Sequence, residues 1–292
     1  MNSKVKLLTK KGVNMKVYKD TDIRNEVQTQ LQANRNLFYG VGILNYEGVT
    51  VDTKINLSEV IADELLRNYH LVEKIGKDTL IRRTKSFNRN HKGVANVKAR
   101  IRRFGYLEYN EKLLAIALYN SKKGYCLGKI FDYEVPIKEA QTDKYGRIDL
   151  VSTDAVNHSV KLIELKIKPK NKDGETLLRA LLEVYTYYKL ISNSFDKFLE
   201  EYKLSPKEYL RFQPAILAEK DALSGQALLN IKEFPRIKAL IAKMNEEIDS
   251  HVEGFVYDYP GKNKPFQSNG EFKQKIMLRG DITIKQINIV GN

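Results

Sequence analysis

The stretch GRIDLVSTDAVNHSVKLIELKIK, residues 146–168, decides how the rest of this sequence is interpreted. Residues 146–153 and 160–168 are rich in Ile, Leu and Val, and the polar residues between them are typical of a turn. The stretch therefore predicts a β-hairpin. A turn centred between Val156 and Asn157 pairs Asp149 directly with Glu164.

Side chains alternate between the two faces of a strand, so Glu164 and Lys166 share a face about 6–7 Å apart, with Asp149 about 5 Å across from Glu164. We expect the opposite, apolar face to carry Ile148, Leu150, Ile163, Leu165 and Ile167. The face with the acids is half apolar as well. Two carboxylates there are costly unless a cation or hydrogen bonds compensate their charge.

An acid-x-lysine triplet is a weak signal by itself, because the chain contains four of them, starting at Asp52, Glu164, Glu201 and Glu271. Asp52 has no acid to pair with across a hairpin, and Glu271 lies in a polar loop. Glu201 falls in a helical pattern, in which residues i and i+2 do not face the same way. Only the triplet at Glu164 combines an apolar strand with a facing acid.

The composition restricts the class of protein. A chain of 292 residues with 42% hydrophobic content can bury a large core, in one large domain or two modest ones. The net charge of +14 favours a polyanionic partner. The single cysteine, Cys126, excludes a disulfide framework and a Cys-rich zinc site. Since no apolar run approaches ~18 residues, we expect a cytoplasmic protein that contacts no membrane.

The chain divides into two predicted regions. Residues 1–105 form a smaller α+β region, with a hairpin over 37–57 and then an amphipathic helix capped by Ser58. Residues 106–292 form the larger domain. Its expected elements are a helix over 107–121, a strand near 129–138, the hairpin, a helix over 174–191, a strand near 214–218, a helix near 224–247 and a strand near 252–258. This order predicts the α/β class, a mixed β-sheet flanked by helices.

A basic connector joins the two regions over residues 79–107, which contain no acid. Basic side chains alternating with aromatic ones suit contact with a phosphate backbone. A solvated linker between domains is the alternative. The candidate nucleic-acid-binding residues are Arg82, Arg83, Lys85, Arg89, Arg100, Arg102 and Arg103.

GRIDLV, a short spacer and KLIELK followed by a helix resemble the PD-(D/E)XK nuclease superfamily, over roughly residues 105–220. Ile148 stands where the superfamily name has proline. The resemblance implies a restriction endonuclease-like core. It also implies an Mg²⁺-dependent endonuclease that hydrolyses phosphodiester bonds in DNA, in restriction, repair or phage defence.

The same resemblance assigns roles to particular residues. Asp149 and Glu164 would bind Mg²⁺, or Mn²⁺ in its place, together with the backbone carbonyl of Leu165. Lys166 would orient the attacking water or stabilise the transition state. Many members place a glutamate on the preceding helix, and Glu111 matches it. Glu111 also lies on the apolar helix face formed by Leu107, Leu114 and Leu118.

One branch of the superfamily carries a glutamine and a tyrosine four residues apart on the following helix. Glu183 and Tyr187 match that spacing with glutamate in place of glutamine. Arg179, Tyr185 and Tyr187 could then contact the substrate, although core packing is the expected role of the tyrosines.

Several alternatives remain open at this point. Glu111 would be a surface residue if the helix register were shifted by one. Lys166 would be structural if it only formed a buried salt bridge with Asp149 or Glu164. The protein would then be a nucleic-acid-binding module that kept the nuclease fold without activity. RNA is an alternative substrate to DNA, and a homodimer is an open assembly state.

Overall fold

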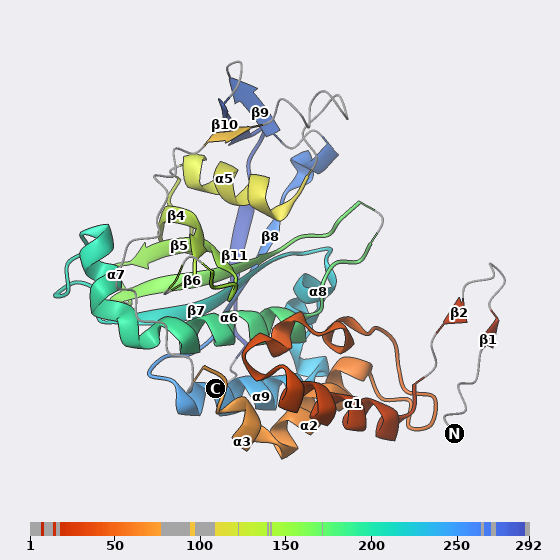
Figure 1. Ribbon diagram of the computed structural model, residues 1–292. Coiled ribbons are helices and arrows are strands. Elements are labelled where there is room, and N and C mark those ends of the chain that lie inside the picture. The colour runs from red at the N-terminus through yellow and green to blue at the C-terminus, as the bar shows by residue number, and fades with distance from the viewer. Residues whose placement is uncertain are drawn as a thin grey trace.

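The structure, a computed structural model, describes residues 7–8, 14–15, 18–76, 94–96 and 109–289, apart from 122, 139, 141, 171, 264–265 and 270–272. Within these residues a six-stranded mixed sheet has helices on both faces (Figure 1). The sheet order is β11-β8-β7-β6-β5-β4. The predicted α/β class, a mixed sheet flanked by helices, is confirmed. None of the helices in the described ranges is long and apolar enough to cross a membrane.

The predicted hairpin lies inside this sheet. It consists of β5 (Arg147–Asp154) and β6 (Ser159–Lys166). The strands pair in the predicted register, with Leu150 opposite Ile163. The turn is closed by Asp154, whose carboxylate accepts hydrogen bonds from the backbone N–H groups of Val156 and Asn157.

The neighbouring strands complete the sheet. β4 (Lys129–Pro136) is antiparallel to β5, β7 (Arg211–Glu219) is parallel to β6, β8 (Glu253–Asp258) is parallel to β7, and β11 (Thr283–Ile287) is antiparallel to β8. Parallel neighbours require crossover connections. The first contains α6 (Leu177–Ile191) and α7 (Phe195–Tyr202), and the second contains α8 (Leu223–Leu229) and α9 (Pro235–Glu247).

The single helix predicted over 224–247 is wrong, because the segment forms two helices, α8 and α9. The second begins at Pro235, a residue suited to the first helical position.

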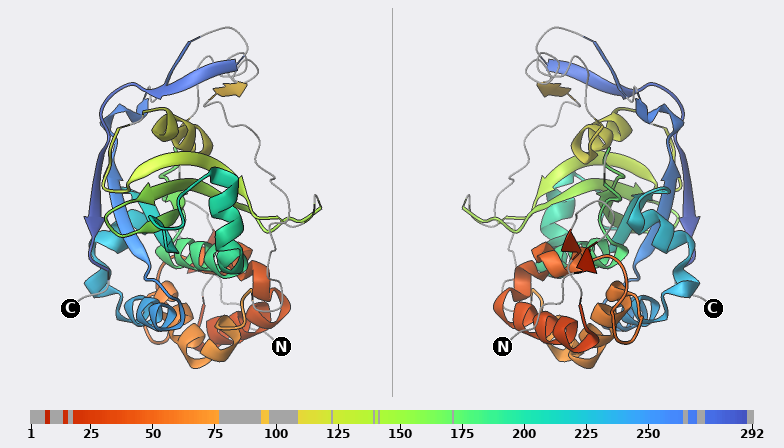
Figure 2. Two further views of the ribbon diagram at one scale, coloured as in Figure 1. Left: turned by 90° about the vertical axis from the view of Figure 1, so that its left-hand side faces the viewer. Right: turned by 90° about the vertical axis from the view of Figure 1, so that its right-hand side faces the viewer.

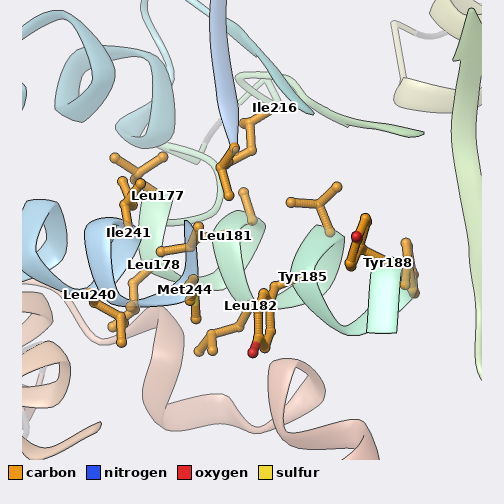
Figure 3. Packing of buried hydrophobic residues seen from close by; sticks show 14 of the residues in the cluster. Leu177, Leu178, Leu181, Leu182, Tyr185, Tyr188, Ile216, Leu240, Ile241 and Met244 are labelled. Atoms are coloured by element: carbon orange, nitrogen blue, oxygen red, sulfur yellow. The ribbon is translucent and has the colours of Figure 1, made fainter. Parts of the chain in front are cut away.

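Two hydrophobic cores lie on opposite faces of the sheet. In one, α6 packs between the sheet and α9, and Leu181, Leu240 and Met244 belong to the same buried cluster (Figure 3). The N-terminal helices α1 (Asp20–Ala33), α2 (Leu57–Arg67) and α3 (Tyr69–Val72) add to this core, below the sheet in Figure 1.

On the other face, α5 (Glu111–Ser121) lies across the sheet (Figure 2), and its buried side chains share a hydrophobic cluster with Leu150, Ile163 and Leu165. A small sheet packs beyond α5 and consists of β3 (Val94–Asn96), β10 (Lys273–Leu278) and β9 (Phe266–Asn269). A two-stranded sheet near the N-terminus consists of β1 (Leu7–Leu8) and β2 (Asn14–Met15).

The predicted face of Ile148 is wrong, because it joins the core on the α6 side instead of the α5 side. Glu134 on β4 has a left-handed φ of 51°, which interrupts the regular alternation of that strand. Tyr133 consequently lies in the α5-side core and Val135 in the α6-side core. Ile148 pairs with Val135 and shares its side.

The hairpin predicted over 37–57 is also wrong. The segment forms two 3₁₀ helices, η1 (Arg35–Gly40) and η2 (Gly42–Asn45), which bury Phe38, Ile43 and Leu44. A single β-bridge joins Val49 to Asn56 among the described residues of this segment. The following helix is capped by Asn56 and not by Ser58, because the Asn56 side chain accepts the Ser58 N–H. The boundary predicted at residues 105/106 lies outside the described residues.

Gly225 provides a test of the packing between β7 and α8. A Cβ at this position would lie 1.9 Å from the backbone oxygen of Glu219. Gly225→Ala should therefore lower the free energy of unfolding by about 1–3 kcal/mol, as measured by denaturant titration. Gly40→Ala is the matched control, because nothing lies within 4 Å of the added methyl group. Equal stability of the two variants would contradict this packing.

Candidate active site

A buried lysine at the end of β6 gathers three carboxylates. The Lys166 Nζ lies 2.7 Å from Glu164 Oε1, 2.7 Å from Glu175 Oε2 and 2.9 Å from Glu183 Oε2. Its side chain is only 4% exposed. A lysine at this depth remains charged only if it is paired, and the three acids raise its pKa well above the ordinary value although burial opposes them.

The local structure explains how these side chains meet. Strand alternation places Glu164 and Lys166 on the face that α6 covers. α6 begins after Thr176, whose hydroxyl accepts the Arg179 N–H at 3.3 Å. Glu175 therefore lies just before the helix, and Glu183 lies on it. In the described part of the chain, the acids that contact Lys166 come from β6 and from the crossover that follows it.

Tyr187 fixes the orientation of Glu183. Its hydroxyl donates a hydrogen bond to Glu183 Oε1 at 2.9 Å. Gly146, which precedes β5 with a φ of 101°, permits this approach, because a Cβ there would lie 2.6 Å from the Tyr187 hydroxyl. The pair that the family resemblance singled out is thus in contact, and Tyr187 holds a side chain of the cluster in addition to packing in the core.

Asp149 belongs to the same cluster. Its Oδ2 accepts a hydrogen bond from the backbone N–H of Leu165 at 2.9 Å. Burial first, and then the charge of Asp149, raise the pKa of Glu164 well above its ordinary value. Leu165 therefore contributes its N–H to the site, whereas the metal-ligand role of its carbonyl remains a prediction.

Glu111 reaches the cluster from α5, on the other face of the sheet. Its carboxylate accepts a hydrogen bond from the backbone of Ile167, and burial is the main reason that its pKa is raised. The charges of Lys166, Glu175 and Glu183 act on it as well. The alternative in which Glu111 is a free surface residue does not describe this structure.

The acids outnumber the cations in this cluster. Burial raises the pKa of Asp149 to about 8, with Lys166 opposing the shift and Glu111 adding to it. The pKa of Glu183 is lowered instead. Its burial acts against this, but the charge of Lys166 and the hydrogen bonds that Lys166 and Tyr187 donate have the larger effect. In the absence of another cation, Asp149 thus retains its proton at neutral pH, and the pKa of Glu164 is displaced in the same direction. Such displaced pKa values are typical of functional sites.

The residues fit a hard divalent cation by their chemistry. Oε2 of Glu164 is buried and accepts no hydrogen bond from the described residues. Carboxylate oxygens are the ligands that Mg²⁺ prefers. In the described ranges no three acidic, His or Cys side chains already stand in a metal-binding arrangement. Because Lys166 Nζ occupies the space among the glutamates, Asp149, Glu164 and Glu111 would hold the ion after a local rearrangement.

Glu134 lies at the edge of the site and was not identified from the sequence. It acts on the pKa of Asp149, and its Oε2 lies 3.3 Å from Arg147 and 3.6 Å from Lys112. Glu175 was also missed, because a loop residue before a helix gives no periodic signal. Both became apparent only when distant segments were brought together by the fold.

The remaining predicted residues have separate outcomes. Asp52 accepts the Asp20 N–H at the start of α1, and Glu201 lies on α7, so neither of these triplets joins the site. Glu271 lies outside the described residues. The candidate nucleic-acid-binding residues also lie outside them, and their role remains a prediction; they are Arg82, Arg83, Lys85, Arg89, Arg100, Arg102 and Arg103.

Comparisons with protein families, with curated proteins and with solved structures found no match for this chain. The similarity to the PD-(D/E)XK superfamily therefore rests on the quoted motif alone.

The raised pKa of Asp149 has a measurable effect on stability. Between its ordinary value near 4 and about 8, the unfolded chain loses this proton while the folded protein keeps it. The contribution of Asp149 to the unfolding free energy therefore falls as the pH rises through this interval. Asp149→Asn removes this loss, so in EDTA the variant should become more stable relative to the wild type as the pH increases from 5 to 9.

Denaturant titrations at pH 5, 7 and 9 would measure this effect. A stability difference between Asp149→Asn and wild type that stays constant over these pH values would contradict the raised pKa. Thermal unfolding provides a second measurement, with a relative gain of roughly 3 °C or more expected at pH 9.

Proposed function

We propose that this protein is an Mg²⁺-dependent endonuclease that hydrolyses phosphodiester bonds in DNA, in restriction, repair or phage defence, and that it acts in the cytoplasm. The observation that carries the proposal is the excess of carboxylates around one buried lysine at the end of the β5–β6 hairpin. The order α5-β4-β5-β6-α6-β7 is also the element order that the resemblance implies.

Each residue of the site has a separate role in the proposed reaction. A divalent cation, when bound, would lower the pKa of a coordinated water and neutralise charge that develops on the phosphate. Asp149, Glu164 and Glu111 would hold it. Lys166 supplies a positive point charge that orients the attacking water or stabilises the transition state. Glu183, itself held by Tyr187, keeps Lys166 in position.

The charge around the site supports a polyanionic substrate. Lys112 and Arg147 extend from α5 and β5 beside Glu134, and each side chain is 51% exposed. Together with the net charge of +14, they favour attraction of a nucleic acid towards the acid cluster. They carry no information on sequence specificity, and they suit RNA as well as DNA.

One observation favours a second candidate function. Lys166 already contacts three carboxylates, which is the pairing that a structural lysine requires. The protein would then be a non-catalytic nucleic-acid-binding protein with a nuclease-like fold. Five acids lie near Lys166, which is more than a structural ion pair needs, and we therefore favour the nuclease over this second candidate. They are Asp149, Glu164, Glu175, Glu183 and Glu111.

Cleavage assays test the proposal directly. Purified protein is incubated with supercoiled plasmid, linear DNA and single-stranded RNA, in Mg²⁺, Mn²⁺ or EDTA. We expect cutting in Mg²⁺ or Mn²⁺ and none in EDTA. Asp149→Ala and Lys166→Ala should each lower the cleavage rate by at least roughly 10²–10³-fold, the effect of removing one group that stabilises a transition state.

Glu201→Ala is the matched control, because it alters another acid-x-lysine triplet on α7. It should cut at the wild-type rate. Cutting that persists in both site variants would reject this site, and nucleic-acid binding without cutting would favour the second candidate. Preference for RNA over both DNA substrates would correct the substrate alone.

A further inference from the structure

Glu175 bridges two cations at the mouth of the acid cluster. One carboxylate oxygen, Oε2, lies 2.7 Å from Lys166 Nζ, and the other, Oε1, lies 3.0 Å from Arg179 Nε. Lys166 belongs to β6, and Arg179 lies in the first turn of α6. A single anion thus connects the proposed catalytic lysine to an arginine at the positive end of a 15-residue helix.

Glu175 differs from the other two partners of Lys166 in its exposure. Its side chain is 31% exposed, compared with 4% for Glu164 and 12% for Glu183. It also lies in the loop before α6 and not inside a strand or helix. Its carboxylate can therefore rotate towards solvent, while Glu164 and Glu183 continue to pair with Lys166.

Arg179 is incompletely satisfied by this contact. Its Nε is buried and, although it lies 3.0 Å from Glu175, it makes no properly directed hydrogen bond to any residue that the structure describes. A guanidinium group prefers two parallel hydrogen bonds to an oxyanion. The geometry around Arg179 is therefore better suited to an anion with more oxygens than the carboxylate that occupies the position.

We infer that the Glu175 carboxylate occupies the place of a substrate phosphate between Lys166 and Arg179, and that the substrate displaces it. The inference rests on the proposed function in taking the ligand to be a phosphodiester. Arg179 becomes a phosphate-binding residue. Glu175 becomes an internal competitor, which occupies the space between Lys166 and Arg179 until a phosphate replaces it.

Two physical arguments support the exchange. A phosphate group and a carboxylate carry the same sign of charge, so both cannot occupy the space between Lys166 and Arg179. A phosphate offers tetrahedral oxygens to both cations at once, which suits the bidentate preference of Arg179. Displaced Glu175 returns to water, where its charge is solvated, so the exchange leaves no buried unpaired carboxylate.

Binding of inorganic phosphate in EDTA tests this inference without cleavage. Isothermal titration calorimetry would compare wild type with Glu175→Gln and Glu175→Ala, which remove the competing charge. We expect both variants to bind phosphate roughly tenfold more tightly, since like charges at contact distance strongly oppose each other. Arg179→Gln should abolish the gain when combined with Glu175→Gln.

Asp173→Asn is the matched control. It removes one negative charge two residues from Glu175, but Asp173 is 63% exposed and pairs only loosely with Lys168 at 3.7 Å. Its phosphate affinity should stay within about twofold of wild type. Unchanged or weaker binding by Glu175→Gln would overturn the inference. An equal gain in Asp173→Asn, or a gain that survives Arg179→Gln, would overturn it as well.

The outcome is separable from that of the cleavage assays. If Asp149→Ala and Lys166→Ala still cut, the proposed active site fails, but the phosphate titrations still decide whether Glu175 competes with an anion. If cutting depends on Asp149 and Lys166 while Glu175→Gln binds phosphate like wild type, the inference alone fails.

Discussion

A charged lysine at the end of β6 has to be neutralised inside the protein, and this requirement organises the whole site. Lys166 is only 4% exposed, so transfer from water is costly unless carboxylates surround it. β6 provides one acid, and the crossover to β7 provides two more. Asp149 and Glu111 lie beside this cluster, and burial first, then the neighbouring acids, raise the pKa of both although Lys166 opposes the shift.

The order and direction of the strands bring these acids close to Lys166. Because β6 and β7 are parallel, the chain must leave the end of β6, cross the sheet in α6 and return. The start of α6 is thereby held beside Lys166, where it places Glu175 and Glu183. α5 approaches from the opposite face and contributes Glu111 at its first turn. The N-terminal region supports this arrangement, because Thr176 at the start of α6 bonds to Leu44 and Asn45 of η2.

Local patterns predicted part of this site, and long-range packing determined the rest. The register of β5 and β6 follows from a two-residue period and a short turn, both of which can be read from adjacent residues. Glu111 follows from its place on an apolar helix face. By contrast, the face of Ile148 depends on the left-handed backbone of Glu134, which lies on another strand. The segment 37–57 resembles a hairpin, yet tertiary burial of Phe38 and Leu44 favours 3₁₀ turns.

A second buried lysine on the same strand shows what a structural ion pair looks like in this protein. Lys161 is 1% exposed and lies 2.9 Å from Asp154 and 2.8 Å from Glu253. The pKa of both acids is lowered although burial opposes this, at Asp154 by Lys161 and Asn157 and at Glu253 by His251 and Lys161, so ionised pairs there stabilise the fold.

Around Lys166 the pKa shifts have the opposite direction, because burial and repulsion between the acids raise the pKa of Asp149 and Glu164. Their ionised forms therefore oppose folding unless a further cation is bound. A lysine that served only structure would need no more than the arrangement around Lys161. The acids around Lys166 exceed what its pairing requires, and this contrast within one strand favours the proposed metal-dependent function over a structural salt bridge.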